Sequence, residues 1–455
     1  MEVKGKKVLV FGLGISGIGA GQILERHGAE VIMYDGNQKL TEEKIKKQLG
    51  EDSSAKIVIG DFPEEVLEKL DMTVLSPGVP TDLPVIEKMR EQGITVIGEV
   101  ELAYQFGKGD VLAITGTNGK TTTTTLLGEI MKNYQEDVFV VGNIGIPYTE
   151  LCDTIDDDSD TVAEISSFQL ETVIDFHPNV SAILNLTPDH LNRHYTFENY
   201  GNVKFSITKN QTMDDVTVLN YDDEHTRAMG EKAKDHCHVV YFSRLEKPAG
   251  GVYVEDGDII LEDGDKKINV LAIKDLKLMG AHNVENVLAA VGISYYMGVP
   301  VDVIRDVATS FKAVAHRIEY VDTVDGVAYY NDSKGTNPDA AIKGIQAMVA
   351  PTFLIGGGYD KGSEYDEWIE AFDGKVKWLV LIGQTAQKIA DCAKRHGFNS
   401  IIFEENLQDA VAYCHENAVD GDAVLLSPAC ASWGQFDNYE QRGDMFKEYV
   451  RSYKE

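Results

Sequence analysis

The sequence has few cysteines and few basic residues, and both shortages exclude classes of protein. Its five cysteines form no C-x-x-C pair and their number is odd, so neither a disulfide framework nor a zinc cluster is indicated. Lysine and arginine number 42 against 74 acidic residues, and the formal net charge of −32 argues against a protein that wraps nucleic acid or coats an anionic membrane. Local basic groups must therefore bind any anionic substrate.

Long hydrophobic runs are also missing. The longest, such as residues 378–382, fall far short of the ~20 residues that cross a bilayer. The N-terminus enters a strand pattern at residues 7–11 with no apolar signal segment before it, so we expect a cytoplasmic protein without membrane insertion. His236, Cys237 and His238 could bind a metal, but adjacent side chains on an extended segment point to opposite faces. We interpret them as ordinary strand-edge residues.

The length and the pattern of elements indicate several domains. A chain of 455 residues is long for one core, and its length favours about three domains. Three times the sequence starts a series of apolar strand, glycine-containing turn and amphipathic stretch, which is typical of parallel α/β sheets. We predict an α/β fold with domains at 1–98, 99–311 and 312–455. The first and third are expected to be Rossmann-like, and the second to be a P-loop ATPase-like domain with a parallel or mixed sheet and a β-rich insertion between residues 213 and 277.

The first glycine loop fits more than one ligand. Residues 8–11 form an apolar strand that leads into Gly12-Leu-Gly14-Ile-Ser-Gly17, and Asp35 ends the next strand, which satisfies the dinucleotide fingerprint. The pattern permits a dehydrogenase, but a helix N-terminus attracts any pyrophosphate, including that of a UDP-sugar. A second turn, Ser76-Pro-Gly78, should line the same sheet edge. The remaining alternative is that the Gly12–Gly17 loop binds no ligand and only allows the following helix to pack against the strand.

The second glycine loop indicates phosphate chemistry more specifically. Gly116-Thr-Asn-Gly119-Lys120-Thr121 follows the buried strand pattern of residues 111–114 and opens a helix. In such a loop backbone N–H groups cradle phosphate oxygens, the lysine neutralises the β/γ charge and the threonine hydroxyl can coordinate Mg²⁺. The expected first glycine position is Ile114, which weakens generic GTPase or kinase readings. A P-loop regulatory switch stays as an alternative.

Further polar residues follow strands in the same domain. Glu164 ends a strand pattern, where the ligands of α/β sheets gather. The apolar strand at 181–184 leads into the segment that carries His190, which we expect at the carboxyl end of that strand. Neither His190 nor Lys204 indicates a role by itself.

In combination, these motifs resemble the Mur ligase family over nearly the whole chain, and most closely its D-glutamate-adding branch. The last domain lacks the Asp-Asn-Pro-Arg motif usual in branches that add a diamino acid, and has residues 427–432 followed by Gln435-Phe436 instead. The markers, in order, are Gly116–Thr121, Gly142-Asn143-Ile-Gly145, Glu164-Ile-Ser-Ser-Phe-Gln-Leu-Glu171, Asp189-His190, Lys204, Gly280-Ala-His-Asn283-Val-Glu-Asn286, His316-Arg317, Asn331-Asp-Ser-Lys334-Gly-Thr336-Asn337 and Ser427-Pro-Ala-Cys-Ala-Ser432.

The resemblance implies an ATP-dependent amide-forming ligase of peptidoglycan precursor synthesis, and so a role in cell wall biogenesis, cell shape and cell division. ATP phosphorylates the L-alanine carboxylate of UDP-N-acetylmuramoyl-L-alanine, the amine of D-glutamate attacks the acyl phosphate, and phosphate leaves. Positioning and electrostatic stabilisation should supply most of the catalysis. The implied partners are these small molecules alone, with no nucleic acid, and the protein is expected to be a monomer.

The resemblance also implies a role for individual residues. Two Mg²⁺ ions are expected, one near Thr121 and Glu164 and the other near His190 and Lys204, the latter carbamylated so that it offers oxygen. The catalytic positions match Lys120, Asn143, His190 and Lys204. The ATP positions match Gly116, Thr117, Asn118, Gly119, Lys120, Thr121, Asn283, Asn286, Arg317 and Asp332. The UDP-substrate positions match Gly14, Ile15, Ser16, Asp35, Ser76, Gly78, Asn143, Ser166, Gln169 and His190. The D-glutamate positions match Lys334, Thr336, Lys361, Ser427 and Phe436. We expect Cys430, inside the last motif, to be packed and unreactive.

Overall fold

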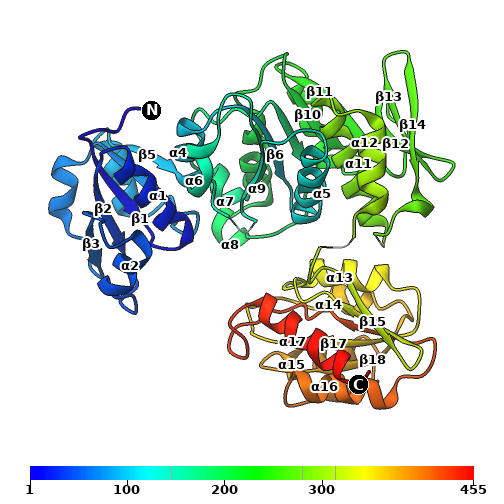
Figure 1. Cartoon of the computed structure of the whole chain (residues 1–455). Coiled ribbons are helices and arrows are strands. Elements are labelled where there is room, and N and C mark those ends of the chain that lie inside the picture. The colour runs from blue at the N-terminus through cyan, green and yellow to red at the C-terminus, as the bar shows by residue number, and fades with distance from the viewer. Residues whose placement is uncertain (145, 279, 313, 455) are drawn as a thin grey trace. The chain divides into compact units, whose positions relative to one another are not determined.

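The computed structural model describes residues 1–144, 146–278, 280–312 and 314–454, with the side chains at 68 and 339 also outside the description. The family marker Gly145 therefore lies outside the described residues. The chain divides into two compact units, one made of Met1–Asp275 with Glu285–Thr309 and the other of Leu276–Val284 with Ser310–Glu455. Figure 1 shows two sheets in the first unit, coloured blue and cyan to green, and one in the second, coloured yellow to red.

The N-terminal sheet has five parallel strands in the order β3-β2-β1-β4-β5. Alternate residues of β1 point into different clusters, Val8 and Val10 toward α1 and α2, Leu9 toward α3. Helices therefore cover both faces, as expected of a Rossmann-like sheet. The elements are β1 (Lys7–Phe11), α1 (Ile15–Arg26), β2 (Glu30–Asp35), α2 (Glu42–Leu49), β3 (Lys56–Ile59), η1 (Glu64–Lys69), β4 (Met72–Leu75), α3 (Pro84–Glu91) and β5 (Thr95–Gly98).

The central sheet has nine strands in the order β14-β13-β12-β11-β10-β9-β6-β8-β7. The strands from β7 to β12 pair in parallel, and β12 to β14 pair antiparallel at one edge. The first elements are α4 (Glu99–Phe106), β6 (Asp110–Thr115), α5 (Lys120–Lys132), β7 (Val138–Gly142), α6 (Tyr148–Leu151), η2 (Cys152–Thr154), β8 (Asp160–Glu164), α7 (Ser167–Leu170), β9 (Val180–Ile183), α8 (Leu191–His194), α9 (Phe197–Phe205) and η3 (Ser206–Thr208).

The predicted β-rich segment between residues 213 and 277 continues this sheet and does not form a separate module. Its strand β10 is buried and pairs in parallel with both β9 and β11, and the helix α10 follows it. The remaining elements of the unit are β10 (Val216–Asn220), α10 (Glu224–Ala233), β11 (His238–Ser243), β12 (Gly251–Glu255), β13 (Asp258–Asp263), β14 (Lys266–Ala272), η4 (Ile273–Asp275), α11 (Ala281–Tyr296) and α12 (Val301–Ser310).

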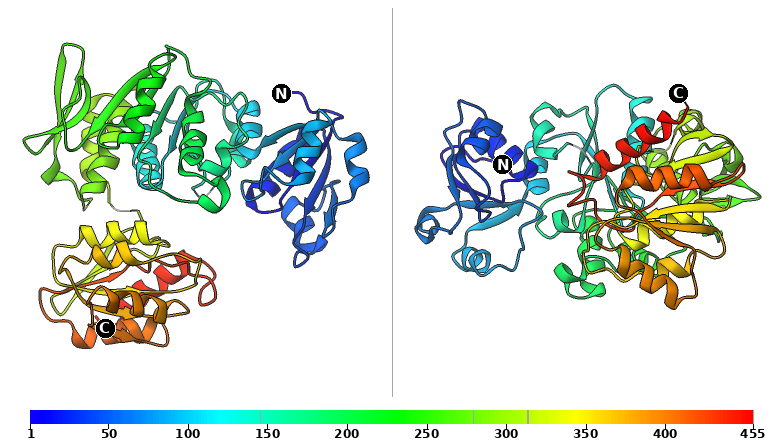
Figure 2. Two further views of the ribbon diagram at one scale, coloured as in Figure 1. Left: turned by 180° about the vertical axis from the view of Figure 1, so that it is seen from behind. Right: turned by 90° about the horizontal axis from the view of Figure 1, so that it is seen from below.

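The C-terminal sheet has six strands in the order β15-β16-β20-β17-β18-β19, of which only β15 is antiparallel to its neighbour. Leu354 packs with the residues of α13 to α15, and Phe353 with those of α16 and α17, so helices cover both faces (Figure 2). The elements are β15 (Glu319–Val324), β16 (Val327–Asn331), α13 (Pro338–Ala347), β17 (Thr352–Gly356), α14 (Asp366–Glu370), β18 (Val376–Leu381), α15 (Ala386–Arg395), β19 (Ile401–Phe403), α16 (Leu407–Asn417), β20 (Ala423–Leu426) and α17 (Tyr439–Ser452).

The predicted α/β class with three sheet-centred domains is confirmed. Among the described residues, no helix combines the length and apolar character that a membrane span needs. All five cysteines are free and buried. In the His-Cys-His segment, Cys237 is buried while His238 is exposed, as expected for side chains on opposite faces.

Candidate active site

The glycine loop of the central sheet connects the end of β6 to the start of α5. Gly116 and Gly119 have φ of +143° and +86°, a backbone conformation that favours glycine. A Cβ on Gly119 would lie 2.2 Å from Asn286 Oδ1, so close packing also requires a glycine there. The Lys120 ammonium donates to the carbonyl oxygens of Gly116 at 2.9 Å and Thr117 at 2.8 Å. The predicted loop, its lysine and the first turn of α5 are thus held together as one compact structure.

Asn185, which follows β9, braces this loop from the neighbouring strand. Its Oδ1 accepts from the backbone N–H of Asn118 at 2.8 Å, and its Nδ2 donates to the Asn118 carbonyl at 3.0 Å. The Thr117 N–H donates to the Asn185 carbonyl at 3.0 Å. We assigned no role to Asn185 from the sequence, although a polar residue directly after a predicted strand was a usable signal. These three hydrogen bonds hold the loop in its conformation.

Glu164, at the end of β8, has a buried carboxylate of which one oxygen is hydrogen-bonded. Its Oε1 accepts from Asn143 Nδ2 at 2.8 Å, and its backbone carbonyl accepts from the Asn143 N–H at 2.8 Å. Its Oε2 is buried and has no hydrogen-bond partner among the described residues. A buried carboxylate oxygen left in this state is costly unless a proton donor or a cation satisfies it. With Thr121 in the first turn of α5, the donors are oxygens, which suit Mg²⁺.

Lys204 enters the same site from α9 and is only 2% exposed. Its Nζ donates to the Gly116 carbonyl at 2.9 Å and lies 4.8 Å from the centre of the Tyr200 ring. Burial, and then repulsion by the Lys120 ammonium, lower the pKa of Lys204 well below its ordinary value. This environment favours the neutral amine over the ammonium.

His190 lies apart from the strand end where we expected it. The strand β9 ends at Ile183, and His190 is the N-cap of the short helix α8, with a left-handed φ of 52°. Its side chain is about half exposed, with Nε2 3.5 Å from Asp189 Oδ2 and the ring 4.8 Å from that of Phe168. The expectation of a strand-end position was wrong because the intervening loop carries the histidine onward to the helix.

Ser166 and Gln169 form the capping box of α7. The Ser166 hydroxyl accepts from the Gln169 N–H at 3.4 Å, and Gln169 Oε1 accepts from the Ser166 N–H at 2.8 Å. Both residues thus stabilise a helix start, a role that the sequence pattern also permitted. Ser76 of the N-terminal sheet and Gln169 line one narrow crevice.

Arg193 joins the N-terminal turn after β4 to the central sheet. Its guanidinium donates to the Val79 carbonyl at 2.7 Å and to Glu171 Oε2 at 2.6 Å. Tyr195 donates a short hydrogen bond to Asp82 from the same segment. The turn with Ser76 is therefore fastened to the segment that carries His190.

In the first glycine loop, the backbone of α1 packs closely against the end of β1, while the residues at the start of the helix are exposed to solvent. A Cβ on Gly17 would lie 1.9 Å from the Gly12 carbonyl oxygen, so helix and strand approach too closely for another residue. Asp35 accepts from the Leu13 N–H at 2.8 Å through Oδ2, and Ser76 donates to the Gly12 carbonyl at 2.6 Å. The predicted Gly14, Ile15 and Gly78 are exposed and Ser16 is partly exposed.

In the second unit, Asp332 follows β16 and Ser427 follows β20, the neighbouring strand. The Ser427 hydroxyl donates to Asp332 Oδ2 at 2.7 Å, and the Ile318 N–H donates to Oδ1 at 3.3 Å. Burial raises the pKa of Asp332 to about 6, against the opposing effects of Ser427 and of Arg317. The residues that we had divided between the ATP and D-glutamate sites are therefore directly bonded.

Arg317 is close enough to Asp332 to affect its pKa, and His282 is close to Arg317. Arg317 Nε is buried without a hydrogen-bond partner among the described residues. His282 Nε2 is in the same state, and burial, Arg317 and Lys343 lower the pKa of His282 to about 3, so this ring is neutral. Unpartnered buried donors and a neutral ring are suited to a polar ligand. The sequence analysis gave His282 no role, although it lies inside the marker at 280–286.

Arg442, from α17, is a further residue to which the sequence analysis gave no role. It is 1% exposed, and its guanidinium donates to the Ser333 hydroxyl at 2.9 Å, the Ser333 carbonyl at 2.7 Å and the Cys430 carbonyl at 3.2 Å. It thus ties together the loops that follow β16 and β20. Burial raises the pKa of the Cys430 thiol, which contacts Tyr365 and is packed as expected.

The other predicted residues lie as follows. Lys334 Nζ is 5.4 Å from the Tyr439 ring centre, and Lys361 is exposed on the loop after β17. Thr336 and Phe436 are partly exposed. In the nucleotide set, Asn286 Oδ1 accepts from the Thr123 hydroxyl at 3.4 Å, and Asn283 is 4% exposed with its N–H bonded to the Gly280 carbonyl at 3.0 Å.

Comparison with known proteins identifies the family. Three family models match: the Mur ligase MurD-like N-terminal domain at residues 6–98, the Mur ligase middle domain at 114–294 and the Mur ligase glutamate ligase domain at 316–430. A UDP-N-acetylmuramoylalanine–D-glutamate ligase of Lachnoclostridium phytofermentans is 53% identical over 455 residues, covering 100% of both chains. The ligase of the same name from Lachnospira eligens is 55% identical over 452 residues, covering 99% of this chain and 100% of its own.

Solved structures share the fold at low identity. The UDP-N-acetylmuramate-alanine ligase MurC of Thermotoga maritima has a TM-score of 0.61 and 18% identity, over 98% of this chain and 99% of that one. The MurF ligase of Thermotoga maritima in complex with ADP has a TM-score of 0.59 and 17% identity, over 99% and 96%. From the identity and coverage of its relatives, this chain belongs to the Mur ligase family.

Proposed function

We propose that this chain ligates D-glutamate to UDP-N-acetylmuramoyl-L-alanine with ATP, giving UDP-N-acetylmuramoyl-L-alanyl-D-glutamate, ADP and phosphate. The observation that best supports this reaction is a cluster at one edge of the central sheet. It contains Lys120 of the phosphate loop, the buried Lys204, and the buried Glu164, whose Oε2 has no hydrogen-bond partner among the described residues. The relatives named for this reaction, at about half identity over full length, support the choice of substrates.

In the first step the L-alanine carboxylate attacks the γ-phosphorus of ATP, which forms an acyl phosphate and releases ADP. Lys120 is proposed to neutralise the γ-phosphate, and the backbone N–H groups of the loop to hold the phosphate oxygens; the bonds of Lys120 to the loop carbonyls support this role. Asn143 acts on the substrate and the transferring phosphoryl group, and it orients Glu164 through its hydrogen bond to Oε1. Mg²⁺ held by Thr121 and Glu164 would offset the negative charge of the phosphates.

In the second step the amine of D-glutamate attacks the carbonyl carbon, the C–N bond forms and phosphate leaves. Lys334, Thr336, Lys361, Ser427 and Phe436 are proposed to form the acceptor pocket. Two lysines opposite a dicarboxylate give charge-assisted binding in a chain that is otherwise strongly acidic. Asn283, Asn286, Arg317 and Asp332 are proposed for adenine and ribose.

We propose that Lys204 carries a carbamate and that a second Mg²⁺ is held there with His190. Carbamate formation requires the neutral amine, and the burial of Lys204 beside Lys120 favours that form. An ammonium would repel Mg²⁺, whereas a carbamate offers it oxygen.

The UDP end of the substrate is proposed to bind at the first glycine loop. Gly14 is the N-cap of α1, and Ile15 and Ser16 are its first two residues, so this helix start can offer backbone N–H groups and a helix dipole to a pyrophosphate. Asp35 is proposed near the uracil or ribose, and Ser76 and Gly78 beside the pyrophosphate. Ser166, Gln169 and His190 complete the set. The bonds of Arg193 to Val79 and Glu171 support a continuous site from this loop to the central sheet.

The location, oligomeric state and biological role of the enzyme complete the proposal. We propose that the enzyme acts in the cytoplasm as a monomer, and that its functional domains span 1–98, 99–311 and 312–455. A role in peptidoglycan precursor synthesis, and through it in cell shape and division, follows from the proposed product.

The decisive experiment measures phosphate release by the full-length enzyme with Mg-ATP across combinations of acceptors. We expect release only with UDP-N-acetylmuramoyl-L-alanine and D-glutamate together, because only the amine resolves the acyl phosphate. Equal turnover with L-glutamate or L-lysine would contradict the proposal, and slow ATP hydrolysis without an amino acid would favour a regulatory switch. Calorimetry with NAD and the UDP-sugar tests the dehydrogenase alternative, which tighter binding of NAD would support.

A further inference from the structure

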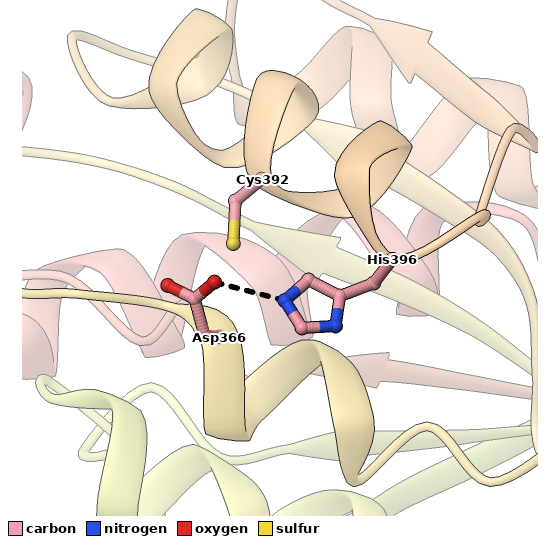
Figure 3. Close-up of side chains that lie close together, drawn as sticks. All are labelled: Asp366, Cys392 and His396. Atoms are coloured by element: carbon pink, nitrogen blue, oxygen red, sulfur yellow. Dashed lines mark hydrogen bonds and ion pairs between the residues drawn. The ribbon is translucent and has the colours of Figure 1, made fainter.

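A cysteine, a histidine and a carboxylate meet in the C-terminal unit, at a place that the ligase reaction does not use. Asp366 begins α14, Cys392 lies in α15, and His396 is the C-cap residue of α15 (Figure 3). One ligand atom from each lies within 4.8 Å of the others. His396 Nε2 and Asp366 Oδ1 are 2.8 Å apart. From these groups and their spacing we propose a binding site for a transition-metal cation of the zinc class.

The spacing of the ligands suits a tetrahedral ion. Cys392 and His396 are four residues apart at the end of one helix, so both side chains lie on the same face. With metal bonds of about 2.0–2.3 Å, tetrahedral ligand atoms lie roughly 3.3–3.8 Å apart. The present separations require side-chain adjustments of about 1 Å or less to reach that range. The helices α14 and α15 pack together, so their backbones already hold the three ligands.

The surroundings supply the features of a metal site beyond its ligands. Glu370 Oε1 is 3.6 Å from His396 Nδ1, on the side of the ring away from Asp366. Such a carboxylate fixes the orientation of a metal-binding histidine and makes it a stronger ligand. Cys392 is 3% exposed, while the other two ligands are open to solvent and give an ion its entry path. One coordination position would be left for water.

The charges also balance. A thiolate and a carboxylate together offset a divalent cation, and the histidine binds as the neutral ring. Arg395 lies 3.5 Å from Asp366 Oδ1 and would have to turn aside, while Glu364 and Glu370 add negative charge nearby. Metal binding displaces the proton of the Cys392 thiol, because the thiolate is the form that binds a metal.

The site is distinct from the proposed ligase centre. Thr385, which precedes α15, bonds to Gly358 at the carboxyl edge of the sheet, and the ligands lie at the other end of the helix. Along α15, His396 lies about 16 Å and Cys392 about 10 Å from Thr385. The sulfur ligand also sets it apart in chemistry, because the predicted Mg²⁺ ligands are oxygens and nitrogen. The pattern Cys392-x-x-x-His396 differs from the C-x-x-C spacing of zinc clusters, and its third ligand, Asp366, is distant in the sequence, so the site was not predicted from the sequence.

Cobalt spectroscopy of the full-length enzyme tests the proposal. We expect Co²⁺ to produce a thiolate-to-cobalt charge-transfer band that saturates at one ion per chain and that Zn²⁺ abolishes by competition. Cys392→Ser should lose the band. Asp366→Asn changes an exposed side chain, so it should fold normally and weaken Co²⁺ binding at least about tenfold, since loss of even an outer-shell partner costs that much.

The matched control is Asp391→Asn, an exposed carboxylate on the same helix that faces Gln387. It should leave the band and the Co²⁺ affinity unchanged. Absence of the band in the wild-type protein, its persistence in Cys392→Ser, or an equal loss of affinity in Asp391→Asn and Asp366→Asn would each overturn the proposal. Co²⁺ bound only at the oxygen-ligated centre would give no charge-transfer band, so the readout does not depend on the ligase assignment.

Discussion

The buried carboxyl of Asp332 should make the stability of the C-terminal unit fall as pH rises. Burial raises its pKa to about 6 from an ordinary value of 3.8. Between these pH values the unfolded chain has lost the proton while the native protein keeps it. The native state then binds more protons, so the free energy of unfolding decreases with pH, and the loss is complete above about pH 6.

The size of this effect follows from the pKa difference. A shift from 3.8 to about 6 is roughly two pKa units, which at about 1.4 kcal/mol for each unit is about 3 kcal/mol. Asp332→Asn removes the ionisation and keeps an oxygen that can accept from the Ile318 N–H. The Ser427 hydroxyl can turn to accept from the new amide. We therefore expect the variant to match the wild type near pH 4 and to exceed it by up to about 3 kcal/mol at pH 8.

Calorimetric unfolding of both proteins at a series of pH values measures the difference, read from the transition of the C-terminal unit. Asp391→Asn, which changes an exposed carboxylate, is the control and should show no such trend. A stability difference that stays constant from pH 4 to pH 8 would show that the pKa of Asp332 is not raised in the native protein. So would an Asn variant that is less stable than the wild type at pH 8, because the charge would then be stabilised by Arg317 and Arg442 more than burial penalises it.

Four other changes test the proposed ligase site. Lys120→Ala should lower kcat at least about 100-fold in phosphate-release assays without unfolding the protein, and near-normal turnover would remove Lys120 from the mechanism. Lys204→Ala should be nearly inactive but partly rescued by small carboxylates, whereas rescue by alkylamines would indicate that a cation is needed. Lys361→Ala should raise the KM for D-glutamate about tenfold or more and that for ATP far less, and an ATP-selective defect would move Lys361 to the nucleotide site. Gly119→Ala should cost about 1–2 kcal/mol from the left-handed backbone alone, with a further loss from contact with Asn286, so an unchanged melting temperature would contradict the loop geometry.

Local chemistry accounts for what the sequence predicted well. The strand predicted at 7–11 lies at the same residues in the structure, because buried parallel strands are continuous apolar runs bounded by turns. Glu164 was correctly placed at a strand end for the same reason. His190 was misplaced, since nothing in its neighbours shows how far a loop runs before a short helix begins.

The α/β class, the phosphate loop and the family could be predicted from the amino-acid sequence, because strand runs, glycine turns and the family's motifs are all visible along the chain. Which distant residues meet could not be predicted and depends on the packing of the sheets and helices. Asn185 braces Asn118, Lys204 bonds to Gly116, and Ser427 bonds to Asp332 across 95 residues. These contacts arise because the strand order brings the carboxyl ends of parallel strands to one edge of each sheet. They also depend on helices that bury polar side chains against that edge, as α9 buries Lys204. Burial then changes the pKa values of Lys204 and Asp332, so the protonation state of the site is a property of the packed sheet and not of the residue types.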